Sequence, residues 1–201
     1  MSGAEWMAER VLLFIPLLLS LTVHEWAHAF AADRLGDDTP RHQGRLTLDP
    51  TAHMDPIGTF VLPLLGVPIG WAKPVVVNPN RFTTSEGFGM MLTAAAGPAS
   101  NLVLAALLWM ASIVSENLSA PAALLRALDH AALLNLGLAL FNLLPLPPLD
   151  GSRVVNWLMP DALRPAWDFV QARGPLVLMV LLGALAVLGG FSSLSGLFAG
   201  R

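Results

Sequence analysis

Four long apolar stretches are the feature that most limits how this chain can fold. A helix that crosses a bilayer needs roughly 20 consecutive, mainly apolar residues, and the stretches 8–34, 87–115, 121–147 and 174–199 meet that requirement. Of the 201 residues, 55% are hydrophobic and only 12% are charged. A soluble domain carries about 25% charged residues, and a chain this short cannot bury so much apolar surface. We therefore predict an all-α polytopic membrane protein with about four transmembrane helices.

The segment 56–78, between the first two predicted spans, has a different composition. It is rich in proline and glycine, which break helices, and in valine, which favours strands. Non-helical backbone at membrane depth is tolerated only where protein or a water-filled cavity covers it. We therefore predict a re-entrant or interfacial β-hairpin at 56–78, inside a single membrane-embedded domain that covers residues 1–201.

The distribution of basic residues predicts the orientation. Eight of the 11 lysines and arginines lie in the loops that follow the first and third spans, and three lie on the other side. Since cytoplasmic loops are enriched in positive charge, we expect a multi-pass protein of the cell (inner or cytoplasmic) membrane with its N-terminus outside. A signal peptide with cleavage near Ala31 is the alternative, although Glu5 and Glu9 are unusual for one. The chain has no run of basic residues that would indicate a nucleic-acid partner.

The first apolar stretch contains the run His24-Glu25-Trp26-Ala27-His28. Histidines four residues apart lie on one helix face, about 5.4 Å apart along the axis, so both imidazoles can reach one metal ion. Glu25 projects at another angle and can contact a water molecule held by the metal, as in other HExxH sites. Ionisable groups at mid-membrane cost about 2.5–3.5 kcal/mol each. The alternative is a pair of interfacial histidines with Glu25 bonded to a neighbour.

The third metal ligand has to be His, Asp or Glu, because the chain has no cysteine. A catalytic zinc usually has three protein ligands and one open position. Arg34 stands where a metzincin has its third histidine. Asp150 is the best candidate, because the prolines within 145–148 end the third apolar stretch beside it and Gly151 permits a tight turn. The alternative is a solvated aspartate at a helix end.

With HExxH in one apolar helix and Asn-Leu-Leu-Pro-Leu-Pro-Pro-Leu-Asp-Gly over residues 142–151, the chain resembles the site-2 proteases, the intramembrane zinc metalloproteases of peptidase family M50. Residues 45–50, 53–58, 70–75 and 96–101 also look like family segments. The chain looks like a minimal form without a PDZ or CBS domain. The resemblance implies one zinc ion per chain, held by the ligands His24, His28 and Asp150. It also implies Glu25 as the base for a zinc-activated water, and Asn142 as a residue that positions substrate or stabilises the oxyanion.

Substrate contacts are expected at two further places. Val75, Val76 and Val77 offer an unpaired edge to which an extended substrate can add as a strand. Asn101 is either a buried contact between helices or a residue that handles substrate. His53 is expected to be structural or near the substrate path.

The predicted function is hydrolysis of peptide bonds in transmembrane or membrane-anchored substrates, at a site toward the cytoplasmic side. The expected partners are a transmembrane protein or peptide and the lipid bilayer, with a homo-oligomer left open. A metal transporter on the same fold is one alternative, although no second polar layer appears in 87–115 or 174–199. A catalytically inactive scaffold is the other, and the intact Glu25 argues against it.

Overall fold

A computed structural model describes residues 3–61 and 71–187, and every regular element in that part of the chain is helical. The predicted all-α class is therefore confirmed for these residues. Four helices are long: α1 (Gly3–Arg34), α4 (Glu86–Asn117), α5 (Ala122–Asn142) and α7 (Arg164–Val187). The shorter elements are α2 (Thr39–His42), α6 (Asp150–Leu158), the 3-10 turns η1 (Pro50–Ala52), η3 (Pro79–Arg81) and η4 (Asp161–Leu163), and the π-helix η2 (Pro56–Val61).

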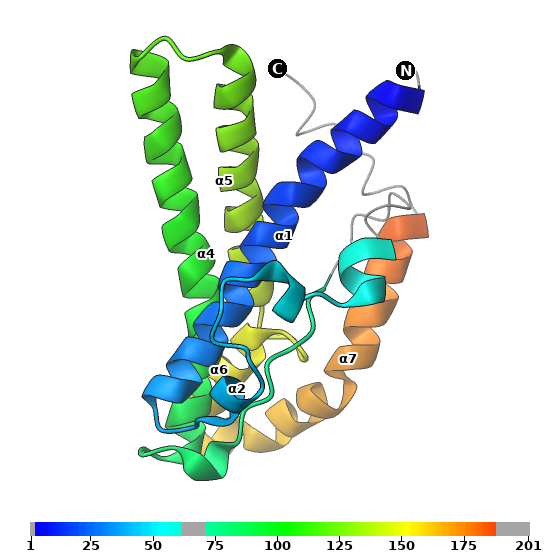
Figure 1. Cartoon of the computed structure of the whole chain (residues 1–201). Coiled ribbons are helices and arrows are strands. Elements are labelled where there is room, and N and C mark those ends of the chain that lie inside the picture. Colours follow the sequence, from blue (N-terminus) through cyan, green and yellow to red (C-terminus); the bar gives the residue numbers. More distant parts are fainter. Residues whose placement is uncertain (1–2, 62–70, 188–201) are drawn as a thin grey trace.

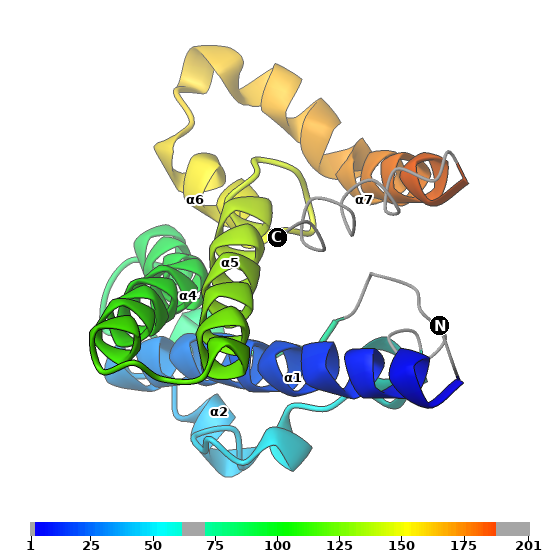
Figure 2. The same cartoon turned by 90° about the horizontal axis from the view of Figure 1, so that it is seen from above.

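Helices α4 and α5 form an antiparallel pair, and α1 crosses both of them (Figures 1 and 2). Helix α6 packs against the lower part of α4, while α7 stands on the other side of α6, away from the α4–α5 pair. Small side chains let the helices approach closely, as is common in membrane bundles. Six alanines from α1, α4 and α5 are almost completely buried: Ala29, Ala32, Ala94, Ala105, Ala132 and Ala139.

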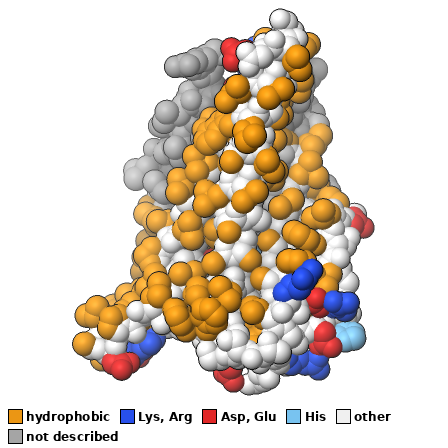
Figure 3. All heavy atoms as spheres, turned by 90° about the vertical axis from the view of Figure 1, so that its left-hand side faces the viewer, with side chains coloured by type: hydrophobic (Ala, Val, Ile, Leu, Met, Phe, Trp, Pro, Cys, Tyr) orange, Lys and Arg blue, Asp and Glu red, His pale blue; other side chains and the backbone are white. Residues whose placement is uncertain are grey.

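Two of the described helices, α4 and α5, are long and apolar enough to cross a membrane. The face of the molecule in Figure 3 is largely covered by hydrophobic side chains, and most of its charged side chains gather at the lower end. The expected spans 8–34 and 174–199 include residues whose side chains the structure does not describe, so a count of four spans stays a prediction. Helix α5 ends at Asn142, before the predicted limit of 147, because the prolines that follow cannot continue a helix.

The predicted β-hairpin at 56–78 is not confirmed. Residues 56–61 form a π-helix, residues 71–78 have no regular structure, and residues 62–70 lie outside the described part of the chain. The helical turn has a local cause that the composition does not reveal. The Asp55 carboxylate accepts hydrogen bonds from two backbone N–H groups of the first turn, at 3.0 and 2.8 Å, and such side-chain bonds favour a turn over a strand.

The segment 71–78 is held along its length by bonds to the chain between α1 and η2. The Lys73 N–H donates to the carbonyl of His53 at 2.8 Å, and the carbonyl of Lys73 accepts from the Arg45 guanidinium at 3.2 Å. Further on, the Asn78 N–H donates to the Asp37 carboxylate at 2.7 Å. Both Arg45 and Asp37 are buried. These anchors fix an extended segment beside α1, although it has no strand partner among the described residues.

Candidate active site

The side chains of His24 and His28 on α1 meet the side chain of Asp150 on α6 in the protein interior. The two histidine Nε2 atoms are 3.0 Å apart, and Asp150 Oδ2 lies 3.1 Å from His24 Nε2 and 3.3 Å from His28 Nε2. All three residues are buried, with at most 9% of their surface exposed. The structure thus brings together the three predicted ligands, two of which are 126 residues apart in the sequence.

Asp150 is delivered by a tight turn after α5. It is the first residue of α6, where the helix dipole favours a carboxylate. A Cβ atom added to Gly151 would lie 2.1 Å from the carbonyl oxygen of Leu143, so the turn folds back onto the end of α5 with no room for a side chain. The Ser152 hydroxyl donates to the carbonyl of Leu149 at 2.7 Å and closes the first turn of α6. The close approach of backbone to backbone therefore fixes where the carboxylate points.

Hydrogen bonds at the far side of each imidazole determine which nitrogen faces the centre. His28 Nδ1–H donates to the carbonyl oxygen of Thr93 at 2.7 Å, and His24 Nδ1–H donates to the Asn101 side-chain oxygen at 2.6 Å. Because Nδ1 carries the hydrogen in both rings, both Nε2 atoms present lone pairs to the Asp150 carboxylate. Three acceptors this close together repel one another unless a cation lies among them. Two imidazoles and a carboxylate are a donor set that suits a transition metal, zinc above all.

Gly97 on α4 lies directly against both metal-ligand candidates. A Cβ atom at this position would be 2.4 Å from His28 Nε2 and 2.7 Å from His24 Cε1. A residue with any side chain larger than the hydrogen of glycine would therefore displace the two imidazole rings. Gly97 therefore belongs to the site for steric reasons, although no sequence motif predicted that role. The available signal was a glycine inside a long apolar helix, where glycine often marks close packing.

Glu25 lies next to the cluster but bonds in another direction. Its Oε2 atom accepts a hydrogen bond from the backbone N–H of Val75 at 3.1 Å. The structure thus brings together a predicted catalytic residue and a predicted substrate-binding residue. Val76 is 56% exposed, whereas Val75 and Val77 are half-buried.

The remaining predicted site residues have other contacts. Asn101 is fully buried and bonds to His24 between α4 and α1, as the interhelical alternative expects; its predicted contact with substrate stays a prediction. The Asn142 amide donates to the carbonyl of Leu138 at 2.9 Å, and within the described residues it has no bond to the three ligand candidates. His53 is buried, donates from Nε2 to a backbone carbonyl at 2.9 Å, and is not part of the cluster.

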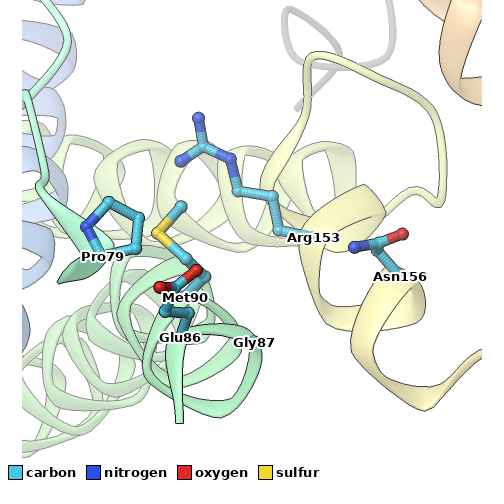
Figure 4. Close-up of a pocket in the computed structure, with 6 residues that line it drawn as sticks. All are labelled: Pro79, Glu86, Gly87, Met90, Arg153 and Asn156. Atoms are coloured by element: carbon cyan, nitrogen blue, oxygen red, sulfur yellow. The ribbon is translucent and has the colours of Figure 1, made fainter. Parts of the chain in front are cut away.

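A hollow of about 260 Å³ lies at the end of α4 that begins with Glu86. Arg153 follows Asp150 by one turn of α6, and Met90 precedes Thr93 by one turn of α4, so both helices lead from the hollow to the ligands. In Figure 4, Arg153 and Asn156 stand on one side of the hollow and the residues from η3 and α4 on the other. The six lining residues are Pro79, Glu86, Gly87, Met90, Arg153 and Asn156.

Comparison with known proteins identifies the family. The sequence model described as peptidase family M50 matches residues 112–185. The "Putative zinc metalloprotease YwhC" of Bacillus subtilis is 40% identical over 195 residues, which cover 94% of this chain and 87% of that protein. The "Putative zinc metalloprotease Rip2" of Mycobacterium tuberculosis is 35% identical over 189 residues, covering 90% of this chain and 70% of that protein. No solved structure matches the chain. The extent and identity of these matches show that the chain belongs to peptidase family M50, the site-2 proteases.

Proposed function

We propose that this chain is a zinc metalloendopeptidase that cleaves transmembrane or membrane-anchored substrates inside the bilayer. The proposal rests on one observation: the imidazoles of His24 and His28 and the carboxylate of Asp150 form a buried cluster, and the carboxylate of Glu25 lies beside it. Membership of the M50 family and the zinc metalloprotease names of the relatives support it. We place the protein in the cell membrane with its N-terminus outside and the site toward the cytoplasm, as the charge distribution indicates.

His24, His28 and Asp150 would hold one zinc ion and leave a position open. When bound, zinc polarises a carbonyl oxygen and lowers the pKa of a water molecule to about 7. The protein's own contribution is the fixed orientation of the two rings, which the Nδ1 hydrogen bonds supply.

Glu25 is the general base in this proposal. One carboxylate oxygen is occupied by the Val75 N–H at 3.1 Å, which leaves the other oxygen free to accept a proton from the attacking water. The same group then returns the proton to the leaving amine. Asn142 uses one amide hydrogen within its own helix. Its second amide hydrogen can donate to the oxyanion, and a donor of this kind is worth about 3 kcal/mol.

The segment 71–78 is the proposed docking edge for substrate, and its bonding pattern narrows the role to one residue. In an extended segment, successive residues direct their backbone groups to opposite sides. The N–H groups of Lys73 and Val75 are already bonded to the protein, and Pro74 has no N–H. Val76, the next residue along, is largely exposed and makes no backbone hydrogen bond within the described residues, so it offers its N–H and carbonyl to an added strand.

The decisive experiment uses the purified chain in detergent or liposomes with a single-span model substrate. We expect the wild type to cleave, Glu25→Gln to lose cleavage by at least about 100-fold, and both to bind one zinc ion. Glu116→Gln is the matched control and should retain activity, because Glu116 is exposed near the C-terminal end of α4, far from the part of α4 that contacts the histidines. Equal cleavage by the wild type and Glu25→Gln would refute the proposal. Zinc transport without any cleavage would favour the transporter alternative.

A further inference from the structure

A chain of buried polar side chains extends from His24 into the bundle, away from Asp150. The Asn101 side-chain nitrogen donates to the Asn135 side-chain oxygen at 2.7 Å, and the Asn135 nitrogen donates to the Ser20 hydroxyl at 2.9 Å. The Ser20 hydroxyl in turn donates to the carbonyl of Pro16 at 2.6 Å. We define Ser20, His24, Asn101 and Asn135 as the buried polar network. Each of the four residues has at most 5% of its surface exposed.

The network joins the three helices that form the bundle. Ser20 and His24 lie on α1, Asn101 on α4 and Asn135 on α5. Polar side chains within an apolar bundle are costly unless they have partners, and they tend to be retained for function. In this network every side-chain N–H and O–H group has an acceptor, so nothing is left unpaired.

Backbone carbonyls fix the direction of every bond. The Asn101 nitrogen donates to the carbonyl of Ser20 at 3.3 Å, and the Asn135 nitrogen donates to the carbonyl of Ala131 at 2.8 Å. A carbonyl oxygen can only accept, so each amide nitrogen has to face its carbonyl and each amide oxygen has to face the other way. The Asn101 oxygen consequently points at His24 Nδ1, which must carry the hydrogen. His24 Nε2 is then left as a lone pair directed at the metal position.

We propose that Asn135 is a positioning residue for the metal site, acting through Asn101 to fix the tautomer and orientation of His24. The inference rests on the proposed zinc site but assigns a role to a helix, α5, that contributes no ligand. Without Asn135, the Asn101 side-chain nitrogen keeps only its longer bond to the Ser20 carbonyl, so the amide is held less firmly against rotation. A rotated amide would present N–H groups to His24 and favour the wrong tautomer. Outer partners of metal ligands typically account for about 10–100-fold in metal affinity.

The test measures metal binding rather than cleavage. We expect Asn101→Leu to weaken zinc binding by about 100-fold and Asn135→Leu by about 10-fold, in competition titrations with a chromophoric chelator. The cobalt-substituted forms of both variants should show altered d–d absorption bands, because the ligand field at His24 changes. Thr22→Val is the matched control: Thr22 is buried on α1, and among the described residues its hydroxyl bonds only within its own helix, to the carbonyl of Leu18. It should leave the affinity and the spectrum unchanged.

Thermal unfolding of the metal-free proteins separates this role from simple helix packing. If Asn135→Leu lowers the Tm but keeps the zinc affinity within twofold and the cobalt spectrum of the wild type, the network is only structural and the inference is wrong. A wild type that binds no zinc would instead overturn the proposed function. The two failures are therefore distinguishable.

Discussion

Gly97→Ala is the sharpest single test of the site, because the substitution adds one methyl group against both ligand rings. The new Cβ atom would lie 2.4 Å from His28 Nε2, whereas ordinary van der Waals contact begins at 3.4 Å. The ring has to move by about 1 Å, and a displacement of that size can cost about 100-fold in rate. Rotation of the ring offers no relief, since His28 Nδ1 is held by the Thr93 carbonyl at 2.7 Å. We expect zinc affinity and cleavage each to fall by about 100-fold, or about 2.7 kcal/mol.

The measurement is a zinc titration with parallel cleavage of a single-span substrate. Gly137→Ala on α5 is the control, because a Cβ atom there meets nothing within 4 Å. That variant should bind zinc like the wild type and be more stable by about 0.5–1 kcal/mol, since alanine favours a helix over glycine. If Gly97→Ala binds zinc with wild-type affinity while folding normally, the packing of α4 against the two rings is not what the structure indicates.

Three further substitutions test the surroundings of the site. Val75→Pro removes the N–H that bonds to Glu25, so kcat should fall by about tenfold with zinc affinity unchanged, and an unchanged kcat would refute the role of this bond. Val76→Pro removes the free N–H of the docking edge and should raise KM more than it lowers kcat; the reverse pattern would argue against strand addition. Gly151→Ala places a methyl group 2.1 Å from the backbone of Leu143, which should destabilise the protein by about 1–3 kcal/mol in thermal unfolding and weaken zinc binding; a stable variant would show that the turn can relax.

Much of the metal site could be predicted because its signals are local. The spacing of His24 and His28 places them on one helix face, and the prolines before Asp150 predict where a helix must end. Two other positions near the site, Gly97 and Asn135, could not be predicted from the sequence. Gly97 matters because it has no side chain, and only the packing of α4 on α1 shows that. Asn135 carries no motif at all.

The fold departed from the sequence analysis where local capping outweighed composition. The helix breakers and valines of the segment 56–78 indicated a hairpin, yet the Asp55 carboxylate caps a helical turn at 56–61. Helix α5 ends five residues before the predicted limit of 147 because prolines follow it, and hydropathy does not register where a backbone can no longer continue a helix. Hydropathy therefore located the helices better than it located their ends.

The separation of the ligands along the chain has a consequence for how the protein is made. Two of the proposed ligands come from the first helix, and the third, Asp150, lies 126 residues after His24. A chain that emerges N-terminus first cannot complete the site until Asp150 has been synthesised and α6 has folded onto α4. A bound ion would then act as a late cross-link between α1 and α6, and it would stabilise the folded state by an amount that grows with the logarithm of the free zinc concentration. A chain whose synthesis stops before residue 150 would thus lack one of the three proposed ligands.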